Sequence, residues 1–268
     1  MKKKTLFTLF TFVILVCFSL VGCRANQENT SKSENTTTQK TELTVAAASS
    51  LKKAFTEIGS EFEKDNNSKV TFSFGATSTL AEQVINGAPF DLFVAANVKD
   101  VDKLIEKGAL ISDTKKLYAL GLVGIATPKN SKVQVKTIED LLNPEIKKIA
   151  IANPETAPYG LAAKNALETA GLWDKLKSKM VYGKSISETA TLITTGNADA
   201  GFIALSLKDD KTLNFNLIDQ KMHKPLNQAM AIVKASKNQE LAKKFIEYVN
   251  SEKGKLIMNK YGFEAPKE

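Results

Sequence analysis

Two adjacent serines, Ser49 and Ser50, follow an apolar run and open a segment of helical periodicity that carries Lys52 and Lys53. Serines at such a junction serve one of three purposes. They cap the helix, or Ser50 and Lys53 form the Ser-x-x-Lys pair of an acyl-transfer enzyme, or the hydroxyls bind a ligand. The local spacing permits all three interpretations, so the rest of the chain has to decide among them.

Three later segments repeat this arrangement of a small or hydroxylic turn between an apolar run and a helical pattern. They are FGATSTL (74–80), NPETAPYGL (153–161) and YGKSISETA (182–190). Each helix start offers backbone N–H groups without an intrahelical partner, together with a partial positive charge. One such turn is most simply an N-cap, but several that converge form an anion site without any charged side chain.

The strength of such a site is sufficient for specific capture. A hydrogen bond to a charged group stabilises by roughly 1.5–3 kcal/mol net. About seven of them around one dianion support a dissociation constant in the micromolar range or below, after the costs of ordering and desolvation. A Lys or Arg ligand would add attraction but less discrimination by size and geometry.

The elements that must position these turns alternate along the chain. Apolar or alternating runs predict strands at 43–48, 69–76, 90–96, 116–127, 147–153, 179–184, 199–206 and 226–236. Helical periodicity predicts helices at 51–64, 79–86, 101–107, 157–173, 185–195, 239–250 and 253–261. Capping boxes are expected at Thr79-x-x-Glu82 and Ser185-x-x-Glu188. The alternation predicts an α/β fold of mostly parallel sheets flanked by helices, with the turns at the carboxyl ends of the strands, where ligands bind.

The N-terminus carries an export signal. A basic start and an apolar run predict a signal peptide at 1–22, and the Leu-Val-Gly-Cys ending looks like a bacterial lipobox that would place a lipid on Cys23. Residues 23–41 are polar and are expected to form a flexible tether. We therefore expect an exported protein that is lipid-anchored to the outer face of the cell membrane.

Composition excludes several classes of function. The two cysteines, Cys17 and Cys23, lie in or next to the signal, so the mature domain has no disulfide. The single histidine, His223, is expected on the surface, which argues against a transition-metal site and a Ser-His-Asp hydrolase. Removing residues 1–22 takes away three lysines and no acid, so the net charge falls from +8 to +5. The remaining excess is scattered, which disfavours nucleic-acid binding.

The enzymatic alternative ranks last. Enzymes with a Ser-x-x-Lys nucleophile also carry Ser-Asp-Asn and Lys-Thr-Gly, and this chain has neither. We expect Lys52 and Lys53 to lie on the solvent side of their helix.

Five runs resemble, in order, the molybdate-binding proteins of bacterial ABC importers. They are AAASSL, FGATSTLAEQVINGAPFDLFVAAN, NPETAPYGLAAKNALETAGLWD, GNADAGFIALS and KYGF, and the resemblance extends over essentially the whole chain from Leu43 to Phe263. The resemblance implies a two-lobed fold like that of type II periplasmic binding proteins, with the ligand in the cleft between lobes. Lobe I is expected at 42–119 and 227–268, and lobe II at 120–226.

The resemblance also implies the ligands. Molybdate or tungstate would be contacted through its oxygens by neutral groups, with Tyr159 and Ile186 donating backbone N–H groups. The implied oxyanion-binding residues are Ser49, Ser50, Thr77, Ser78, Tyr159 and Ile186. Some members also bind the oxyanion with a tyrosine phenol where this chain has Ala204, so that contact is lost or supplied by another hydroxyl, at Ser49 or Ser78.

These features predict a binding protein without a cofactor and without a reaction of its own. The expected partners are the oxyanion and the permease and ATPase subunits of an ABC importer, and we expect a monomer. The alternative within the same class is another oxyanion such as sulfate or phosphate, because charge alone does not separate dianions of different size.

Overall fold

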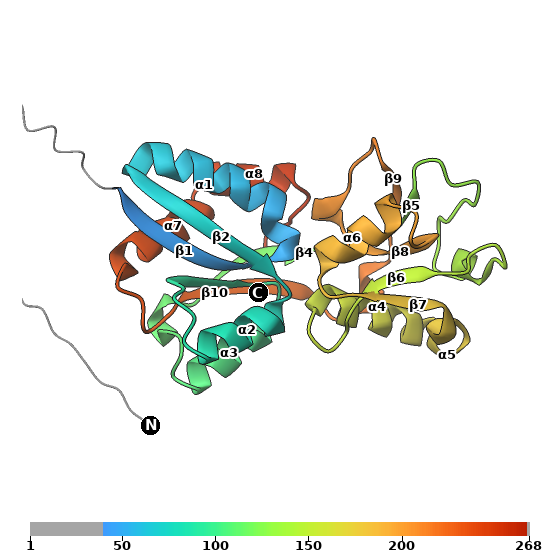
Figure 1. Cartoon of the computed structure of the whole chain (residues 1–268), viewed down its shortest axis with the longest axis horizontal. Helices are drawn as coiled ribbons and strands as arrows, with labels where there is room; N and C mark the ends of the chain where they lie inside the picture. The colour runs from blue at the N-terminus through green and yellow to red at the C-terminus, as the bar shows by residue number, and fades with distance from the viewer. Residues whose placement is uncertain (1–39, 267–268) are drawn as a thin grey trace, which may run out of the picture. The chain divides into compact units, whose positions relative to one another are not determined.

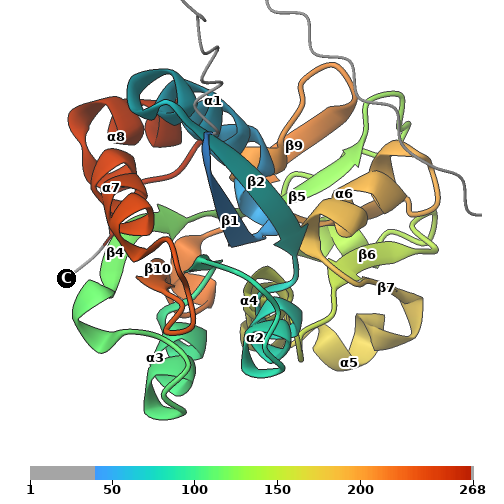
Figure 2. The same ribbon diagram turned by 60° about the vertical axis from the view of Figure 1, so that its left-hand side comes forward.

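The computed structural model describes residues 40–266. The predicted signal peptide, Cys23 and nearly all of the tether lie outside the described residues. Within the described part, the chain forms two five-stranded sheets with helices on both faces (Figures 1 and 2). The α/β fold expected from the sequence is therefore confirmed.

The first sheet has the order β2-β1-β3-β10-β4. Its strands are β1 (Thr41–Ala48), β2 (Ser68–Gly75), β3 (Leu92–Ala95), β4 (Lys116–Gly121) and β10 (Leu226–Ile232). Its helices are α1 (Lys52–Asn66), α2 (Thr77–Ile85), α3 (Val98–Glu106), α7 (Gln239–Asn250) and α8 (Glu252–Lys260). Helices α1, α7 and α8 cover one face of the sheet, and α2 and α3 cover the other (Figures 1 and 2).

The second sheet has the order β7-β6-β8-β5-β9. Its strands are β5 (Val123–Pro128), β6 (Ile149–Ala152), β7 (Met180–Gly183), β8 (Ala200–Ala204) and β9 (Leu213–Leu217). Helices α4 (Pro158–Thr169) and α6 (Ile186–Thr194) cover opposite faces, and the short α5 (Trp173–Leu176) follows α4 (Figure 1). Short 3-10 helices are η1 (Ser49–Leu51), η2 (Ser112–Thr114), η3 (Glu139–Leu142), η4 (Lys177–Lys179), η5 (Leu205–Leu207) and η6 (Gln220–Met222).

Both sheets are mixed rather than mostly parallel. In the first, β1 pairs parallel with β2 and β3, while β10 runs antiparallel to β3 and β4. In the second, β6 pairs parallel with β7 and β8, while β5 runs antiparallel to β8 and β9. The reason is the path of the chain. It leaves the first sheet along β4 and returns along β10, so these two strands must run in opposite directions.

The crossing between the sheets is short. The segment predicted as one strand, 116–127, is two strands in different sheets, separated only by Leu122. Backbone hydrogen bonds between Leu120 and Glu264 in both directions, at 2.8 and 3.1 Å, attach the C-terminal segment to this crossing. Strand β9 was not predicted, because its five residues, LNFNL, are short and flanked by polar residues.

The two predicted capping boxes have different outcomes. Ser185 caps α6 by accepting a hydrogen bond from the N–H of Glu188 at 3.2 Å, as predicted. The box at Thr79 and Glu82 is wrong, because α2 begins two residues earlier, at Thr77, without a side-chain cap. The Thr77 hydroxyl instead accepts the N–H of Ala96 at 3.2 Å, so the turn after β2 is held by the residue that follows β3.

Aromatic side chains form the centre of the core under α1. Phe245 packs edge to face against Phe55 and Phe62, with ring centroids 5.9 and 5.1 Å apart. Such pairs add roughly 0.5–1.5 kcal/mol each beyond the area that they bury. This packing fixes α1, and therefore the turn before it, against the first sheet.

The prediction that His223 lies on the surface is wrong. Its side chain is 8% exposed, its Nδ1 lies 2.8 Å from the carbonyl oxygen of Lys224, and its Nε2 has no partner among the described residues. The polar segment around it packs against α4, where the Thr169 hydroxyl donates to the carbonyl oxygen of Met222 at 3.0 Å. Burial lowers the pKa of His223 from its ordinary value.

This lowered pKa predicts a pH-dependent stability. The unfolded chain binds a proton at His223 below about pH 6.5, whereas the folded protein resists protonation there. The free energy of unfolding should therefore fall as the pH falls below this value, with a contribution of up to about 1.4 kcal/mol per pH unit. Urea unfolding from about pH 7.5 to about pH 5 should show a smaller decrease for His223→Gln than for the unmodified protein. Equal pH profiles would contradict the assignment.

Candidate functional site

The four turns singled out by the sequence meet around one small pocket. It lies between the ends of β1, β2 and β3 on one side and the starts of α4 and α6 on the other. Its lining residues are Ala48, Ser49, Ser50, Gly75, Ala76, Thr77, Ala96, Ala157, Pro158, Tyr159 and Ile186. In the part of the chain that the structure describes, no Lys, Arg, His, Asp or Glu lines this pocket. We call it the hydroxyl pocket.

The hydroxyls of this pocket are buried and able to donate. Ser50 is 0% exposed, and its Oγ has no hydrogen-bond partner among residues 40–266. Thr77 is 1% exposed and uses its oxygen to accept from Ala96, so its own proton remains free. A buried hydroxyl without a partner costs free energy, which indicates that this position is built for a group not supplied by the protein.

The first turns of α4 and α6, the two helices that flank the second sheet, form the other side of the hydroxyl pocket. Tyr159 and Ile186 lie in the first turns of α4 and α6, where backbone N–H groups have no intrahelical partner. Helix α4 approaches β6 closely because Gly160 has no side chain. A Cβ at Gly160 would overlap the carbonyl oxygen of Ala152 and lie 2.6 Å from its carbonyl carbon.

The guest that fits this pocket is small. The cavity volume is about 10 Å³, room for about one water molecule, so the pocket must widen to admit even a small polyatomic anion. The donors and helix starts give the pocket a positive potential. The arrangement therefore suits a compact anion rather than a sugar, a peptide or a cation.

Five of the six predicted site residues line the hydroxyl pocket, and Ser78 does not. The N–H of Ser78 donates to the carbonyl oxygen of Thr156 at 3.1 Å, and its hydroxyl lies 3.4 Å from Asp100 Oδ2. Ser78 thus joins the first-sheet part of the chain to the second-sheet part. Ala204 is also absent from the lining and is fully buried in β8.

Further hydrogen bonds join the two parts around the pocket. Ser187 Oγ donates to the carbonyl oxygen of Ser49 at 2.9 Å, and Ser206 Oγ donates to that of Ser50 at 2.8 Å. These bonds hold the backbone of the pocket serines from the opposite side. The sequence did not reveal Ser187 or Ser206, because nothing local marks a hydroxyl whose partner is more than a hundred residues away.

The expectation that Lys53 lies on the solvent side is wrong, although Lys52 is exposed. Lys53 is half-buried, and its Nζ donates to the carbonyl oxygen of Lys208 at 2.8 Å. Since Ser50 Oγ has no partner, the Ser-x-x-Lys pair is not formed. The geometry therefore offers no activated nucleophile here.

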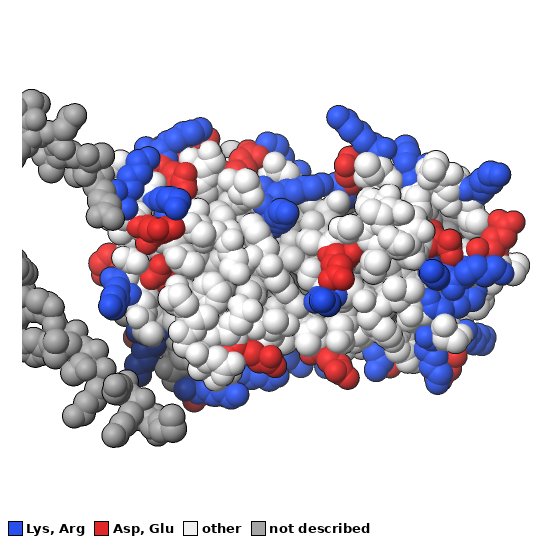
Figure 3. Space-filling model, in the orientation of Figure 1, with Lys and Arg blue, Asp and Glu red and all other residues white. Residues whose placement is uncertain are grey.

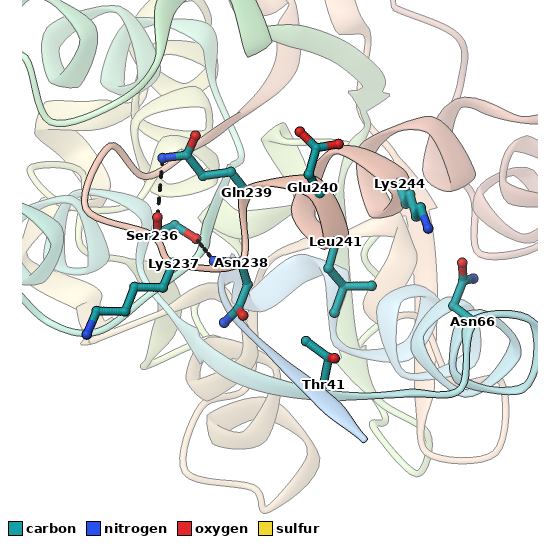
Figure 4. A pocket seen from close by; sticks show the side chains of 9 residues that line it. All are labelled: Thr41, Asn66, Ser236, Lys237, Asn238, Gln239, Glu240, Leu241 and Lys244. Atoms are coloured by element: carbon teal, nitrogen blue, oxygen red, sulfur yellow. Dashed lines mark hydrogen bonds between the residues drawn. The ribbon is translucent and has the colours of Figure 1, made fainter. Parts of the chain in front are cut away.

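A roomier hollow, about 690 Å³, lies at the opposite end of β1, beside Thr41 (Figure 4). Its lining is polar and open. Lys237, Glu240 and Lys244 are exposed, and the Asn238 amide is held by Asp91 Oδ1 at 3.2 Å. Among the described residues, none of those that line this hollow has a buried side-chain polar atom without a partner, so the hollow lacks the feature that marks the hydroxyl pocket.

Charged side chains of both signs lie on the molecular surface. On the face drawn in Figure 3, lysines and acidic residues are interspersed, with uncharged residues between them. Among the described residues, no cluster of His, Cys, Asp and Glu could hold a metal ion. None of the helices within 40–266 has the length and apolar character needed to cross a bilayer.

The chain is similar to known proteins in both sequence and structure. The model of the family described as bacterial extracellular solute-binding protein matches residues 43–264. The chain is 34% identical over 272 residues to YvgL of Bacillus subtilis (strain 168), named as a candidate ABC transporter substrate-binding lipoprotein, with 98% of this chain and 99% of that protein covered. It is 32% identical over 261 residues to the molybdate-binding protein ModA of Azotobacter vinelandii, covering 96% and 98%. The solved periplasmic molybdate-binding protein of Azotobacter vinelandii is similar with a TM-score of 0.79 and 26% identity, over 84% of this chain and 100% of that one.

Proposed function

The chain belongs to the bacterial extracellular solute-binding proteins, and we propose that it captures the tetrahedral oxyanion molybdate, and also tungstate, for an ABC importer. The observation that carries this proposal is the buried Ser50 hydroxyl, which has no partner in a pocket of neutral donors. Relatives at 32% and 26% identity are named as molybdate-binding proteins. The chain hands its guest to the permease and ATPase subunits and performs no reaction, and it needs no cofactor.

The guest is held through its oxygens. The hydroxyls of Ser49, Ser50 and Thr77 and the N–H groups of Tyr159 and Ile186 donate to it. These bonds replace part of the hydration shell of the dianion. Because the donors belong to both sheets, the guest draws the two parts of the chain together.

We assign the two parts as lobes. Lobe I is 42–119 with 227–268, and lobe II is 120–226, so the crossing at Leu122 and the segment before β10 form the hinge. Closure around the guest bends these two connections. A donor that lies in one lobe then reaches a guest already bound to the other.

The chemistry of the pocket disfavours phosphate. Near neutral pH, phosphate keeps at least one proton, which needs an acceptor when it is buried. No carboxylate lines the hydroxyl pocket in the described part of the chain. Molybdate and sulfate carry no proton at this pH, so size distinguishes them.

The N-terminal sequence supports export and anchoring. The signal peptide at 1–22 directs export, a lipid on Cys23 anchors the monomer to the membrane, and the tether spaces it from the surface. The relative from Bacillus subtilis is itself named as a lipoprotein.

The test is a titration of the purified domain with molybdate, tungstate, sulfate and phosphate, followed by Trp173 fluorescence and by thermal unfolding. Molybdate and tungstate should bind with micromolar or tighter dissociation constants and stabilise by about 2.7 kcal/mol at a hundredfold excess over that constant. Sulfate should require much higher concentrations, and phosphate higher still. A response to sulfate equal to that for molybdate would rule out the assignment.

A further inference from the structure

A row of buried hydrogen-bonding groups lies behind the hydroxyl pocket. Gln228 on β10 donates from Nε2 to the Tyr159 phenol oxygen at 2.9 Å. Its Oε1 lies 2.8 Å from the Tyr118 hydroxyl on β4, which is also 2.9 Å from the carbonyl oxygen of Ala95. The side chains of Tyr118, Gln228 and Tyr159 are at most 5% exposed. The row thus joins two strands of the first sheet to the first turn of α4.

The row of hydrogen bonds ends at the Tyr159 phenol and does not continue to Ser50. The Tyr159 oxygen accepts from Gln228, so its own proton needs a different acceptor. Ser50 and Tyr159 both line the hydroxyl pocket. Burial raises the pKa of Tyr159, while Gln228 and Ser50 act in the opposite direction. Ser50 Oγ nevertheless has no partner at hydrogen-bond geometry among the described residues. The two hydroxyls are therefore neighbours that are not yet joined.

An anion in the pocket would complete the row. The Ser50 proton then points to the anion, and the Ser50 oxygen is free to accept from Tyr159. Every donor in the row is then aligned, from Gln228 through Tyr159 and Ser50 to the guest. Aligned hydrogen bonds in a low-dielectric interior polarise and strengthen one another.

We propose that the Tyr159 side chain is a positioning residue for oxyanion capture, which orients the Ser50 hydroxyl toward the guest and ties it to β4 and β10. The inference rests on the proposed function and adds a role for the phenol, distinct from that of the Tyr159 N–H. It also connects the guest to β4 and β10, the two strands of the first sheet that adjoin the hinge.

The position of Gly121 supports this assignment. Gly121 ends β4 immediately before the crossing. A Cβ there would overlap the Tyr159 phenol oxygen and lie 2.6 Å from Gln228 Nε2. Glycine at this position therefore leaves room for the phenol beside the hinge.

A double-mutant cycle on the purified protein tests the proposal. Ser50→Ala, Tyr159→Phe and the double variant are titrated with molybdate. Tyr159→Phe keeps the ring and the backbone N–H, and should weaken binding about tenfold by removing one hydrogen bond next to a charge. If the phenol acts through Ser50, the double variant should bind within about threefold of Ser50→Ala alone. Tyr182→Phe, which removes an exposed phenol on β7, is the matched control and should bind like the unmodified protein.

A merely structural role gives a different result. It would make the two losses of affinity multiply, because the phenol would then act independently of Ser50. Wild-type affinity in Tyr159→Phe, or multiplied losses in the double variant, would overturn the inference. Failure of the unmodified protein to bind molybdate would instead refute the proposed function. If Tyr159→Phe does not fold, Gly121→Ala replaces it in the cycle, because the new Cβ displaces the Tyr159 phenol. Gly121→Ala should weaken molybdate binding when Ser50 is present and should cause little further loss in the Ser50→Ala background.

Discussion

Replacement of Ser50 by alanine should weaken molybdate binding by about 10- to 100-fold, the factor that corresponds to roughly 1.5–3 kcal/mol for a hydrogen bond to a charged group. The free protein should unfold at the same temperature as the unmodified chain or at a higher one. The reason is that Ser50 Oγ is buried without a partner, so alanine removes an unsatisfied polar group and leaves no broken bond. Calorimetric titration and thermal unfolding measure the two effects separately.

Ser60→Ala is a matched control, since Ser60 is an exposed serine on α1. It should change neither affinity nor stability. If Ser50→Ala instead destabilised the free protein and kept its affinity, the hydroxyl would have a structural partner, and the candidate site would lose its central residue.

The second large effect is expected for Gly160→Ala. The new Cβ would overlap the backbone of Ala152, which cannot move aside as a flexible side chain could. The first turn of α4 must then shift away from β6, and it carries both the N–H and the phenol of Tyr159. We expect a destabilisation of about 1–3 kcal/mol, the usual range for overpacking, and a loss of affinity of about 100-fold or more from the displaced donors.

The neighbouring change Leu161→Ala provides the comparison, because Leu161 is 47% exposed on the same helix. It should leave molybdate affinity unchanged and have little effect on stability. Unaltered affinity in Gly160→Ala would mean that the start of α4 does not contribute to the site.

The sequence alone predicted those features that depend on residues close together in the chain. Apolar periodicity predicted α7 at 239–250 with the bounds that the structure shows. The small, hydroxylic turns predicted which segments meet at the hydroxyl pocket, because the carboxyl ends of parallel strands share one edge of a sheet. Thr79 shows the limit of local patterns: its capping box is a common motif, but the helix begins at Thr77, whose turn is held by the N–H of Ala96 after β3.

Contacts between distant segments were beyond the reach of such patterns. Ser187 and Ser206 lie 138 and 156 residues from the serines that they hold, and Tyr118 lies 110 residues from Gln228. Periodicity reports which side of an element is buried but not which partner it meets. For the same reason, Lys53 was expected to face solvent, although its amine reaches the carbonyl oxygen of Lys208, in the loop that follows η5.

The absence of ionisable groups from the lining of the hydroxyl pocket, within the described residues, has a consequence for where the protein can work. Peptide dipoles cannot be neutralised by acid, and dissolved sodium chloride screens buried interactions far less than exposed ones. A receptor built this way should collect its cargo about as well from brackish or mildly acidic surroundings as from fresh water, which is an advantage for scavenging a trace nutrient.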